Sequence, residues 1–317
     1  MDRFESMTAF VAVARAGGFS AAARTMGTPL ATLSRRVADL ESAIGVRLFQ
    51  RSTRQVTLTE SGRGYLAACQ RLLDDLKEAE ESASGEYRAP RGELVVTAPL
   101  AFGRMHLQPV AHEFMAAFPD ISVRLLLADR VVDLVEEHVD VALRIATLAS
   151  SGLVARPVGL VRVVVAGSRG YLERRGTPRQ PSELAKHEGI PWSWAPGQGS
   201  WPFKVGARER SFAVPSRFTT TTAESAVEAC VAGLGLARVA SYQAAPGLRT
   251  GELVLVLRDF EPAPTPVSLV YAGNRLVPLK LRAFIDFAAP RLTAQLKAVE
   301  ATVQARRRRP KMSAATR

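Results

Sequence analysis

The sequence predicts a small helical domain, one long helix and a larger α/β domain, in that order. The first 60 residues show three helical patterns separated by glycines and then two short strand patterns. An acidic stretch with helical periodicity follows over residues 60–84. Beyond residue 91, strand and helix patterns alternate, which is typical of an α/β fold with mainly parallel sheets.

Two short helices open the predicted N-terminal domain. Apolar residues recur at helical spacing over 4–14, and Gly17-Gly18 ends that pattern. We expect Ser20 to be the N-cap of an alanine-rich helix over 21–26. Helices this short need a further element to close a core.

The third predicted helix follows a tight turn and suits a DNA major groove. We expect Thr28 as its N-cap and Pro29 at its first helical position, where a missing N–H costs nothing. Apolar residues from Leu33 to Ile44 recur every three or four positions, whereas the opposite face is polar and cationic. A buried seam with such an outer face is typical of a recognition helix. The residues expected nearest to DNA on this helix are Thr28, Pro29, Leu30, Thr32, Ser34, Arg35 and Arg36.

A two-stranded wing is predicted next, which makes the domain a winged helix-turn-helix. Strand patterns at 46–50 and 56–59 flank a turn that carries Arg51 and Arg54. Arginines at the tip of a hairpin are well placed for phosphates or a minor groove. The alternative, a helical domain that binds another protein, is disfavoured because the helix lengths, the turn and the wing all agree with DNA binding.

A single long helix over 60–84 should follow the wing. Thr59 can cap it, and an apolar stripe that includes Tyr65, Leu72 and Leu76 runs along one side. A helix of this length with so narrow a seam cannot bury itself alone, so pairing with a second copy is the simple solution. Acidic residues occupy much of the remaining surface, which argues that this helix does not lie on DNA.

Composition and charge limit the class of protein. Hydrophobic residues make up 47% of the 317 residues, and the net charge is +12. We expect a cytoplasmic protein without a membrane partner, because no uncharged stretch reaches the length of a membrane span and the N-terminus has no signal-peptide pattern. Half of the excess charge lies in the last 17 residues, which hold six basic residues and no acidic one. We therefore expect 294–317 to be a disordered, solvated tail, with a nonspecific DNA contact as the alternative.

The sequence resembles the LysR-type transcriptional regulators. The resemblance is carried by residues 26–62, MGTPLATLSRRVADLESAIGVRLFQRSTRQVTLTESG, and more weakly by residues 129–145, DRVVDLVEEHVDVALRI. One departure concerns DNA specificity, because the family often has Ser-Gln-Pro where this chain has Pro29, Leu30 and Ala31. Leu30 cannot hydrogen-bond a base, although it could touch a thymine methyl group, so the operator should differ from those of better-known members.

The resemblance implies a division of the whole chain. It places a DNA-binding domain at 1–59, a dimerising linker helix and hinge at 60–90, and a two-lobed, periplasmic-binding-protein-like effector domain at 91–293. Lobe I would comprise 91–160 and 267–293, and lobe II 161–266. The implied partners are double-stranded DNA with dyad symmetry, a second copy or three further copies of the chain, and a small-molecule effector. RNA polymerase is a further candidate partner.

The periodicity of the larger domain predicts its elements individually. The principal helices are expected at 103–117, 131–137, 169–174, 223–232 and 279–288. The principal strands are expected at 93–98, 121–128, 139–145, 161–166, 212–219, 234–239, 254–257 and 266–271, with shorter pieces over 190–205.

The effector is expected between the two lobes, at the carboxyl ends of strands and the N-termini of helices. Helix N-termini attract anions, and Arg144 could pair with a carboxylate, so a small organic anion is favoured. The simpler interpretation is that the threonines only cap a helix and that Arg144 makes an interdomain contact. The residues expected at this site are Ala98, Pro99, Leu100, Phe102, Ala128, Asp129, Arg144, Thr220, Thr221 and Thr222.

Catalysis, metal binding and a cofactor find little support. The four histidines show no metal-ligand spacing, and the chain has no nucleophile elbow and no phosphate loop. Two alternatives stay open: an enzyme with a DNA-binding domain, which would turn over its bound molecule, and an architectural DNA-binding protein, which would not need a two-lobed domain.

The cysteines and tryptophans are expected mainly in the core. Cys69 and Cys230 lie in apolar helical patterns, so packing is favoured over a redox switch. Trp192, Trp194 and Trp201 could line a pocket in lobe II, although packing in the core or at the lobe edge is the commoner role of such a cluster.

Overall fold

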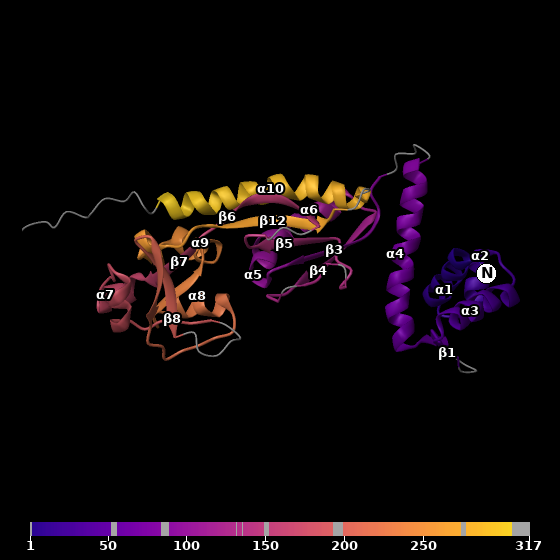
Figure 1. The fold of residues 1–317 in the computed structure, drawn as a ribbon, viewed down its shortest axis with the longest axis horizontal. Helices are drawn as coiled ribbons and strands as arrows, with labels where there is room; N and C mark the ends of the chain where they lie inside the picture. Colours follow the sequence, from indigo (N-terminus) through magenta and orange to yellow (C-terminus); the bar gives the residue numbers. More distant parts are fainter. Residues whose placement is uncertain are drawn as a thin grey trace, which may run out of the picture. The chain divides into compact units, whose positions relative to one another are not determined.

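The chain folds into two compact units, Met1–Ala89 and Pro90–Arg317, in the computed structural model (Figure 1). The structure describes residues 2–51, 56–83, 89–130, 132–134, 136–148, 152–192, 199–273 and 277–305. Within these ranges every helix is too short or too polar to cross a lipid bilayer.

The first unit is the predicted winged helix-turn-helix followed by a long helix. Its hairpin is antiparallel, with Phe49 opposite Leu58. The elements are α1 (Arg3–Ala16), α2 (Phe19–Met26), α3 (Leu30–Ile44), β1 (Phe49–Arg51), β2 (Val56–Leu58) and α4 (Glu60–Ala83).

The core of this unit is built around Phe10 of α1. Its ring centroid lies 5.2 Å from that of Phe49 and 5.8 Å from that of Tyr65 in α4. Cys69, one turn further along α4, is fully buried in the same cluster. The predicted stripe of α4 is therefore divided, because Tyr65 and Cys69 pack on the winged domain whereas Leu72 is 49% exposed.

Two predicted helix caps are wrong. Helix α2 begins at Phe19, before Ser20, and this places Phe19 in edge contact with Phe49 at 5.7 Å. Helix α3 begins at Leu30 with Pro29 as its N-cap, because Pro29 has an extended ψ of 137° and stays outside the helix. The Thr28 hydroxyl instead donates to the carbonyl of Met26 at 3.3 Å. At α4 the prediction is confirmed, since the Thr59 hydroxyl accepts the Gly62 N–H at 2.9 Å.

The second unit contains two lobes, as predicted, and lobe I is built on a five-stranded sheet of order β4-β3-β5-β12-β6. Strand β3 runs parallel to β4 and β5, whereas β12 runs antiparallel to β5 and β6. The strands are β3 (Gly92–Ala98), β4 (Ile121–Leu127), β5 (Val141–Ile145), β6 (Leu153–Val161) and β12 (Thr265–Ala272).

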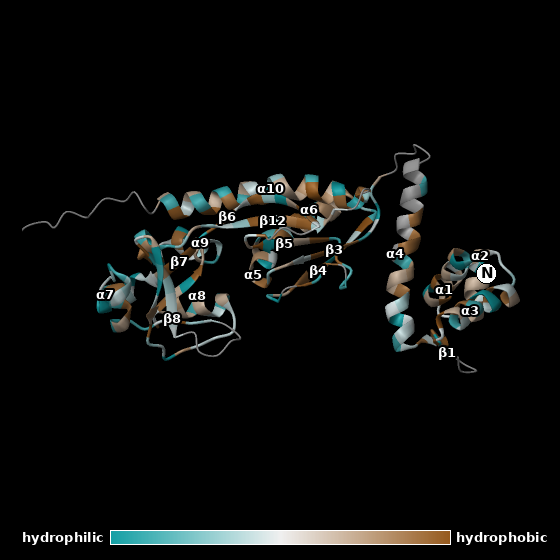
Figure 2. Cartoon of the chain, viewed as in Figure 1, coloured by the Kyte–Doolittle hydropathy of each residue, from teal (hydrophilic) through white to brown (hydrophobic). Residues whose placement is uncertain are grey.

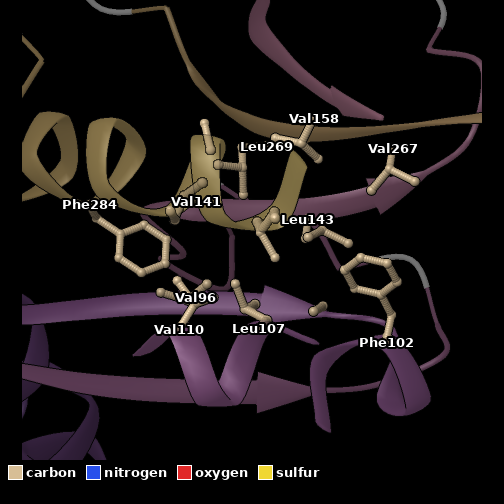
Figure 3. Close-up of a cluster of buried hydrophobic side chains, with 14 of the residues drawn as sticks. Val96, Phe102, Leu107, Val110, Val141, Leu143, Val158, Val267, Leu269 and Phe284 are labelled. Carbon is tan, nitrogen blue, oxygen red and sulfur yellow. The ribbon is translucent and has the colours of Figure 1, made fainter. Parts of the chain in front are cut away.

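Both faces of this sheet are covered at its central strands, which explains the nearly continuous apolar runs of β3 and β5. On one face, side chains such as Val96 and Leu143 pack with α6 (Gln108–Ala117) and α10 (Leu279–Ala305). Figure 3 shows part of this core, where side chains from strands and helices meet. On the other face, Val95 and Ala142 pack with the segment that follows β4.

Lobe II is built on an antiparallel three-stranded sheet of order β10-β7-β11, and its described residues also form a hairpin and three α-helices. Its strands are β7 (Val163–Ser168), β10 (Leu236–Ala240) and β11 (Leu253–Val256), with the hairpin β8 (Ser200–Val205) and β9 (Arg208–Ala213). Its helices are α7 (Arg169–Arg175), α8 (Ala223–Val231) and α9 (Ser241–Thr250), with short 3-10 turns at Pro181–Lys186 and Arg258–Phe260.

The expectation of mainly parallel sheets is therefore wrong. The chain leaves lobe I along β6 and returns along β12, so these neighbouring strands run in opposite directions. In lobe II both neighbours of β7 are antiparallel to it. Strand β6 and helix α9 are elements that the periodicity did not predict.

Two predicted helices of lobe I also change. The helix expected at 103–117 begins at α5 (Leu100–Phe102) and continues through a π-helical turn, Gly103–Leu107, into α6. The helix expected at 131–137 is absent from the described residues of that segment, which form turns. There the Asp133 carboxylate accepts the Glu136 N–H at 3.0 Å, a local bond of the kind that competes with helix formation.

Helix α10 corrects the predicted C-terminal tail. It was expected to end at residue 288, with a disordered tail from 294, but it runs to Ala305. Leu292, Leu296, Val299 and Val303 are buried and continue one apolar stripe at positions i, i+4, i+7 and i+11. Residues 306–317, which carry the basic run, lie outside the described residues.

Helices α9 and α10 join the cores of the two lobes. Tyr242 of α9 packs in the lobe I cluster, whereas Leu248, later in the same helix, packs in that of lobe II. In α10, Val299 belongs to lobe I and Val303 to lobe II. Figure 1 shows α10 lying beside β6 and β12, and Figure 2 shows apolar and polar residues alternating along it, as expected for a helix with one buried side.

Candidate DNA-binding surface and lobe junction

Helix α3 has the two faces that the sequence predicted. Leu33, Val37 and Leu40 are fully buried. On the opposite side Pro29 and Arg35 are exposed, and Leu30 is 47% exposed. Thr28, Thr32 and Ser34 are half-buried and border this face.

The two arginines of α3 differ in their contacts. Arg36 forms a 2.6 Å ion pair with Glu5 of α1 and is only 29% exposed. Arg35 is exposed and has no hydrogen-bond or ion-pair partner in the part of the chain that the structure describes. Arg35 is therefore the cation that α3 presents outward, whereas Arg36 also ties α3 to α1.

The wing arginines can be described only in part. The backbone of Arg51 lies in β1, but its side chain and the whole of Arg54 lie outside the described residues.

The base of the wing is fixed by Glu41, a residue that the sequence interpretation did not single out. One carboxylate oxygen of Glu41 accepts the N–H groups of Leu48 at 2.8 Å and Phe49 at 3.1 Å. The carbonyl of Leu48 accepts the Thr59 N–H at 2.9 Å. These bonds give a physical reason for the Leu-Glu and Leu-Thr-Glu-Ser-Gly segments that carry the family resemblance.

In the second unit, side chains of the two lobes meet at a lobe junction, defined by Phe102, Arg104 and His106 of lobe I with Glu224 and Tyr242 of lobe II. Arg104 lies 3.5 Å from the Glu224 carboxylate. The rings of Phe102 and Tyr242 are in edge contact at 5.1 Å, and His106 lies 5.6 Å from Tyr242. The periodicity gave no signal for Tyr242, because helix α9 was not predicted.

The junction also contains the half-buried imidazole of His106. The Nδ1 atom of His106 lies 2.8 Å from the side-chain oxygen of Gln295, and its Nε2 atom is buried without a hydrogen-bond partner among the described residues. Burial lowers the pKa of His106 and raises the pKa of Tyr242, so both side chains are neutral near pH 7.

Of the effector residues predicted in lobe I, several are already engaged. Asp129 accepts the N–H of Leu100 at 3.0 Å, at the start of the helical run. A carboxylate from the chain itself thus occupies the position where an anionic ligand would bind a helix N-terminus. Ala98 and Phe102 are buried, Pro99 and Ala128 are half-buried, and Leu100 is 36% exposed.

The threonines of lobe II border the first turn of α8. The Thr222 hydroxyl accepts the Ser225 N–H at 3.3 Å and is the N-cap of α8, as the simpler interpretation expected. Thr221 is exposed, whereas Thr220 is half-buried and donates its N–H to the Pro191 carbonyl at 3.2 Å.

The contacts of Arg144 are with residues outside the lobe junction. Its guanidinium donates to the carbonyl of Val132 in lobe I. Burial lowers the pKa of Arg144. Because Ala142 points to the sheet face that contacts Val132, Arg144, two residues later, belongs to that same face.

The cysteines and the described tryptophans are core residues. Cys69 and Cys230 are both buried, and burial raises the pKa of the Cys230 thiol to about 12, which makes it a poor nucleophile. Trp201 is buried, and the half-buried Trp192 donates its indole N–H to the Arg238 carbonyl at 3.1 Å. Trp194 lies outside the described residues.

Comparison with known protein families accounts for both units. Residues 4–63 match the bacterial regulatory helix-turn-helix protein, lysR family, and residues 88–293 match the LysR substrate binding domain. The chain belongs to the LysR family. It is therefore a ligand-responsive transcriptional regulator with a helix-turn-helix DNA-binding domain and an effector-binding domain, in a family that is not enzymatic.

Relatives of known name agree with this assignment over nearly the whole chain. An HTH-type transcriptional regulator of Xanthomonas campestris is 35% identical over 287 residues, covering 89% of this chain and 83% of that protein. A transcriptional repressor of Pseudomonas aeruginosa is 32% identical, covering 90% of this chain and 91% of the relative.

Solved structures show the same architecture. The LysR-type regulator CrgA of Neisseria meningitidis is 31% identical with a TM-score of 0.58, covering 91% of this chain and 98% of that one. The full-length virulence activator AphB of Vibrio cholerae is 27% identical with a TM-score of 0.57, covering 90% and 97%.

Proposed function

We propose that this LysR-family regulator binds dyad-symmetric promoter DNA as a dimer or tetramer, with α3 in the major groove. The observation that carries the proposal is the division of α3, whose buried seam leaves Leu30, Arg35 and the neighbouring hydroxyls on the outside. The residues proposed to contact DNA are Thr28, Pro29, Leu30, Thr32, Ser34, Arg35, Arg36, Arg51 and Arg54.

Self-association follows from what one recognition helix can read. A single helix contacts only a few base pairs, whereas two copies read two half-sites about one helical turn apart or a multiple of it. Leu72 of α4 and Phe4 of α1 are each 49% exposed, and they give the first unit apolar surface that a second copy would bury. We further propose that the regulator acts in the cytoplasm, where it would meet RNA polymerase at its promoters.

For the effector we propose a small organic molecule, in the first instance a carboxylate, that binds at the lobe junction. Arg104 supplies the cation there and is 59% exposed, and Thr221 at the start of α8 supplies a hydroxyl. A carboxylate on Arg104 would compete with Glu224, which now holds it across the lobes. The other residues predicted for the site, including Arg144, stay a proposal.

The test of the DNA-binding proposal is to map the genomic fragments that the purified full-length protein binds. Enrichment at a few dyad-symmetric sites is expected, and the genes beside them would suggest effectors to assay. Uniform, salt-sensitive binding without preferred sites would instead indicate an architectural DNA-binding protein and would contradict the proposal.

The test of the effector proposal is a carboxylate library screened against the full-length protein by calorimetry. Binding that Arg104→Gln weakens, with a changed affinity for the mapped DNA site, would support the lobe junction as the effector site. Saturable binding that Arg144→Ala abolishes and Arg104→Gln leaves unchanged would move the site to the opposite face of lobe I.

A further inference from the structure

Lobe II contains a pocket of about 580 Å³ whose lining residues do not include those of the lobe junction. Its walls come from the C-terminal end of α7, from residues 188–190, from the loop at 217–218 and from the turn that follows α8. The turn at 233–234 follows the C-terminal end of α8, whereas Thr222 is its N-cap, and the loop at 217–218 ends two residues before Thr220.

The pocket is cationic. Arg174, Arg175 and Arg217 line it, and Glu188 is the one acidic residue among its described lining residues. Arg175 is only loosely paired with Glu188, at 3.9 Å, and Arg174 donates to the Gly233 carbonyl at 3.3 Å. Arg217 has no hydrogen-bond or ion-pair partner among the described residues, so its guanidinium is available to a ligand.

The position of Arg217 distinguishes a ligand-binding role of the lining arginines from a purely structural role. Arg174 and Arg175 lie in the last turn of α7, where a positive charge stabilises the helix end whether or not anything binds. Arg217 lies in a loop, outside any helix, and therefore gains nothing from a helix terminus. Helix stability thus explains two of the three arginines and leaves the third unexplained.

The wall behind the cations is held by hydrogen bonds. The hydroxyl of Tyr171 accepts the Glu188 N–H at 2.9 Å and lies 3.2 Å from Nδ1 of His187. Tyr171 and His187 are both buried. At Gly235 a Cβ atom would lie 2.4 Å from the Glu188 carbonyl oxygen, so the two backbones are in close contact. Such a wall does not have to rearrange when a ligand enters.

Apolar side chains border the same pocket. Phe218, next to Arg217, is 40% exposed, and Leu234, which follows α8, is 47% exposed. Ile190 also lines the pocket and is buried. A ligand that bound only through its charge would leave this apolar surface in water, so the pocket favours a molecule with an apolar body beside its anionic group.

We propose that this pocket is a second small-molecule site, which takes an organic oxyanion with an apolar body. Guanidinium groups pair with carboxylate and phosphate oxygens through two parallel hydrogen bonds, and Arg217 would provide the first of these pairs. Phe218 and Leu234 would cover the apolar body. The site is separate from the effector site proposed at the lobe junction and does not depend on it.

The test uses isothermal titration of the full-length protein with phenyl phosphate, inorganic phosphate and phenol. Phenyl phosphate is expected to bind saturably and more tightly than either fragment, because only it offers both the anion and the ring. Arg217→Gln should weaken phenyl phosphate binding by at least about tenfold, the usual effect of losing a charged hydrogen-bond pair. The matched control is Arg208→Gln, which removes an exposed arginine of β9 on the same lobe and should change nothing.

Three outcomes would overturn the proposed site, and a fourth would contradict its proposed ligand. The first three are no saturable binding at millimolar phenyl phosphate, equal losses in Arg217→Gln and Arg208→Gln, and binding that Arg104→Gln abolishes while Arg217→Gln retains it. The second outcome would mean diffuse attraction to a basic surface, and the third would place the ligand at the lobe junction. Equal affinity for phenyl phosphate and inorganic phosphate would contradict the apolar part of the proposed ligand.

Discussion

Gly62 shows how much a single position can constrain the winged domain. A Cβ atom at this residue would lie 2.1 Å from the carbonyl oxygen of Leu48. That oxygen cannot move freely, because it accepts the Thr59 N–H while the N–H of Leu48 is held by Glu41. The glycine of the family motif is thus required by a close approach of two backbones.

Gly62→Ala is expected to lower the free energy of unfolding of the first unit by about 1–3 kcal/mol, as overpacking against fixed atoms does. Gly64→Ala is the matched control, because a Cβ there meets nothing within 4 Å and alanine should stabilise the exposed helix by about 0.5–1 kcal/mol. Urea unfolding followed by circular dichroism measures both variants, and equal effects of the two substitutions would contradict the close approach.

Arg35→Ala is expected to weaken binding to a mapped operator by about 1–3 kcal/mol if Arg35 contacts a guanine edge. Arg36→Ala is the comparison, because Arg36 is shared with Glu5 and its loss should also lower stability. Binding is measured by fluorescence anisotropy on operator and random DNA at one salt concentration. An equal loss on both DNAs would assign Arg35 to the phosphate backbone.

The half-buried imidazole of His106 predicts a pH dependence of stability. Because burial lowers its folded pKa, the unfolded chain takes up a proton first as the pH falls. The free energy of unfolding of the second unit should therefore be at its full value above the unfolded pKa of about 6.5 and should fall below it. His106→Gln should reduce this pH slope, which urea unfolding at several pH values measures. The slope that remains is assigned in part to His187, whose pKa burial also lowers.

At the scale of elements, local patterns identified most helices and strands but not what happens at their ends. The seam of α3 was readable because its residues are close in sequence. The pairing of Arg36 with Glu5 could not be predicted from a local pattern, because the two residues are 31 positions apart. The same holds for the contact between Phe19 and Phe49, which moves the start of α2. The antiparallel return of β12 beside β6 depends on residues more than 100 positions apart, which no local period can report.

For helix α10, the sequence contains a signal for the full length of the helix. Its stripe continues past residue 293 to Val303, but the basic run that follows favoured the interpretation as a tail. For the predicted effector residues, the sequence suggested more than local contacts allow. Their residue types favoured an anionic ligand, but several of their polar groups already form hydrogen bonds within the chain.

A chain that ends after Thr293 is expected to lose several kcal/mol of stability in its second unit. It would lack Leu296, Val299 and Val303, and removing a large buried apolar side chain costs about 2–5 kcal/mol. A chain that ends after Ala305 keeps all three and serves as the control. Similar melting temperatures for the two truncated proteins would contradict the structural role of the last three turns of α10.

At the scale of the whole molecule, the division into two compact units predicts two separable unfolding transitions. Gly62→Ala should shift one transition and the truncation after Thr293 the other, because each change lies within a single unit. Differential scanning calorimetry of the full chain resolves them. A single transition that both changes shift equally would show that the units fold as one.

The extension of α10 across both lobes limits how the effector domain can change shape. Lobes joined only by two extended crossings can rotate about them as about a hinge, but here a third, helical connection has side chains buried in each lobe. Arg162, which lies where β6 passes into β7, is further clamped by Glu261 at 2.5 Å and Glu300 at 3.6 Å. Wide opening would have to extract Val303 or bend the helix, so the motion that suits this construction is a small shear of packed surfaces. Ligand binding in this regulator would then be transmitted by helices that slide past one another, and not by closure of the two lobes.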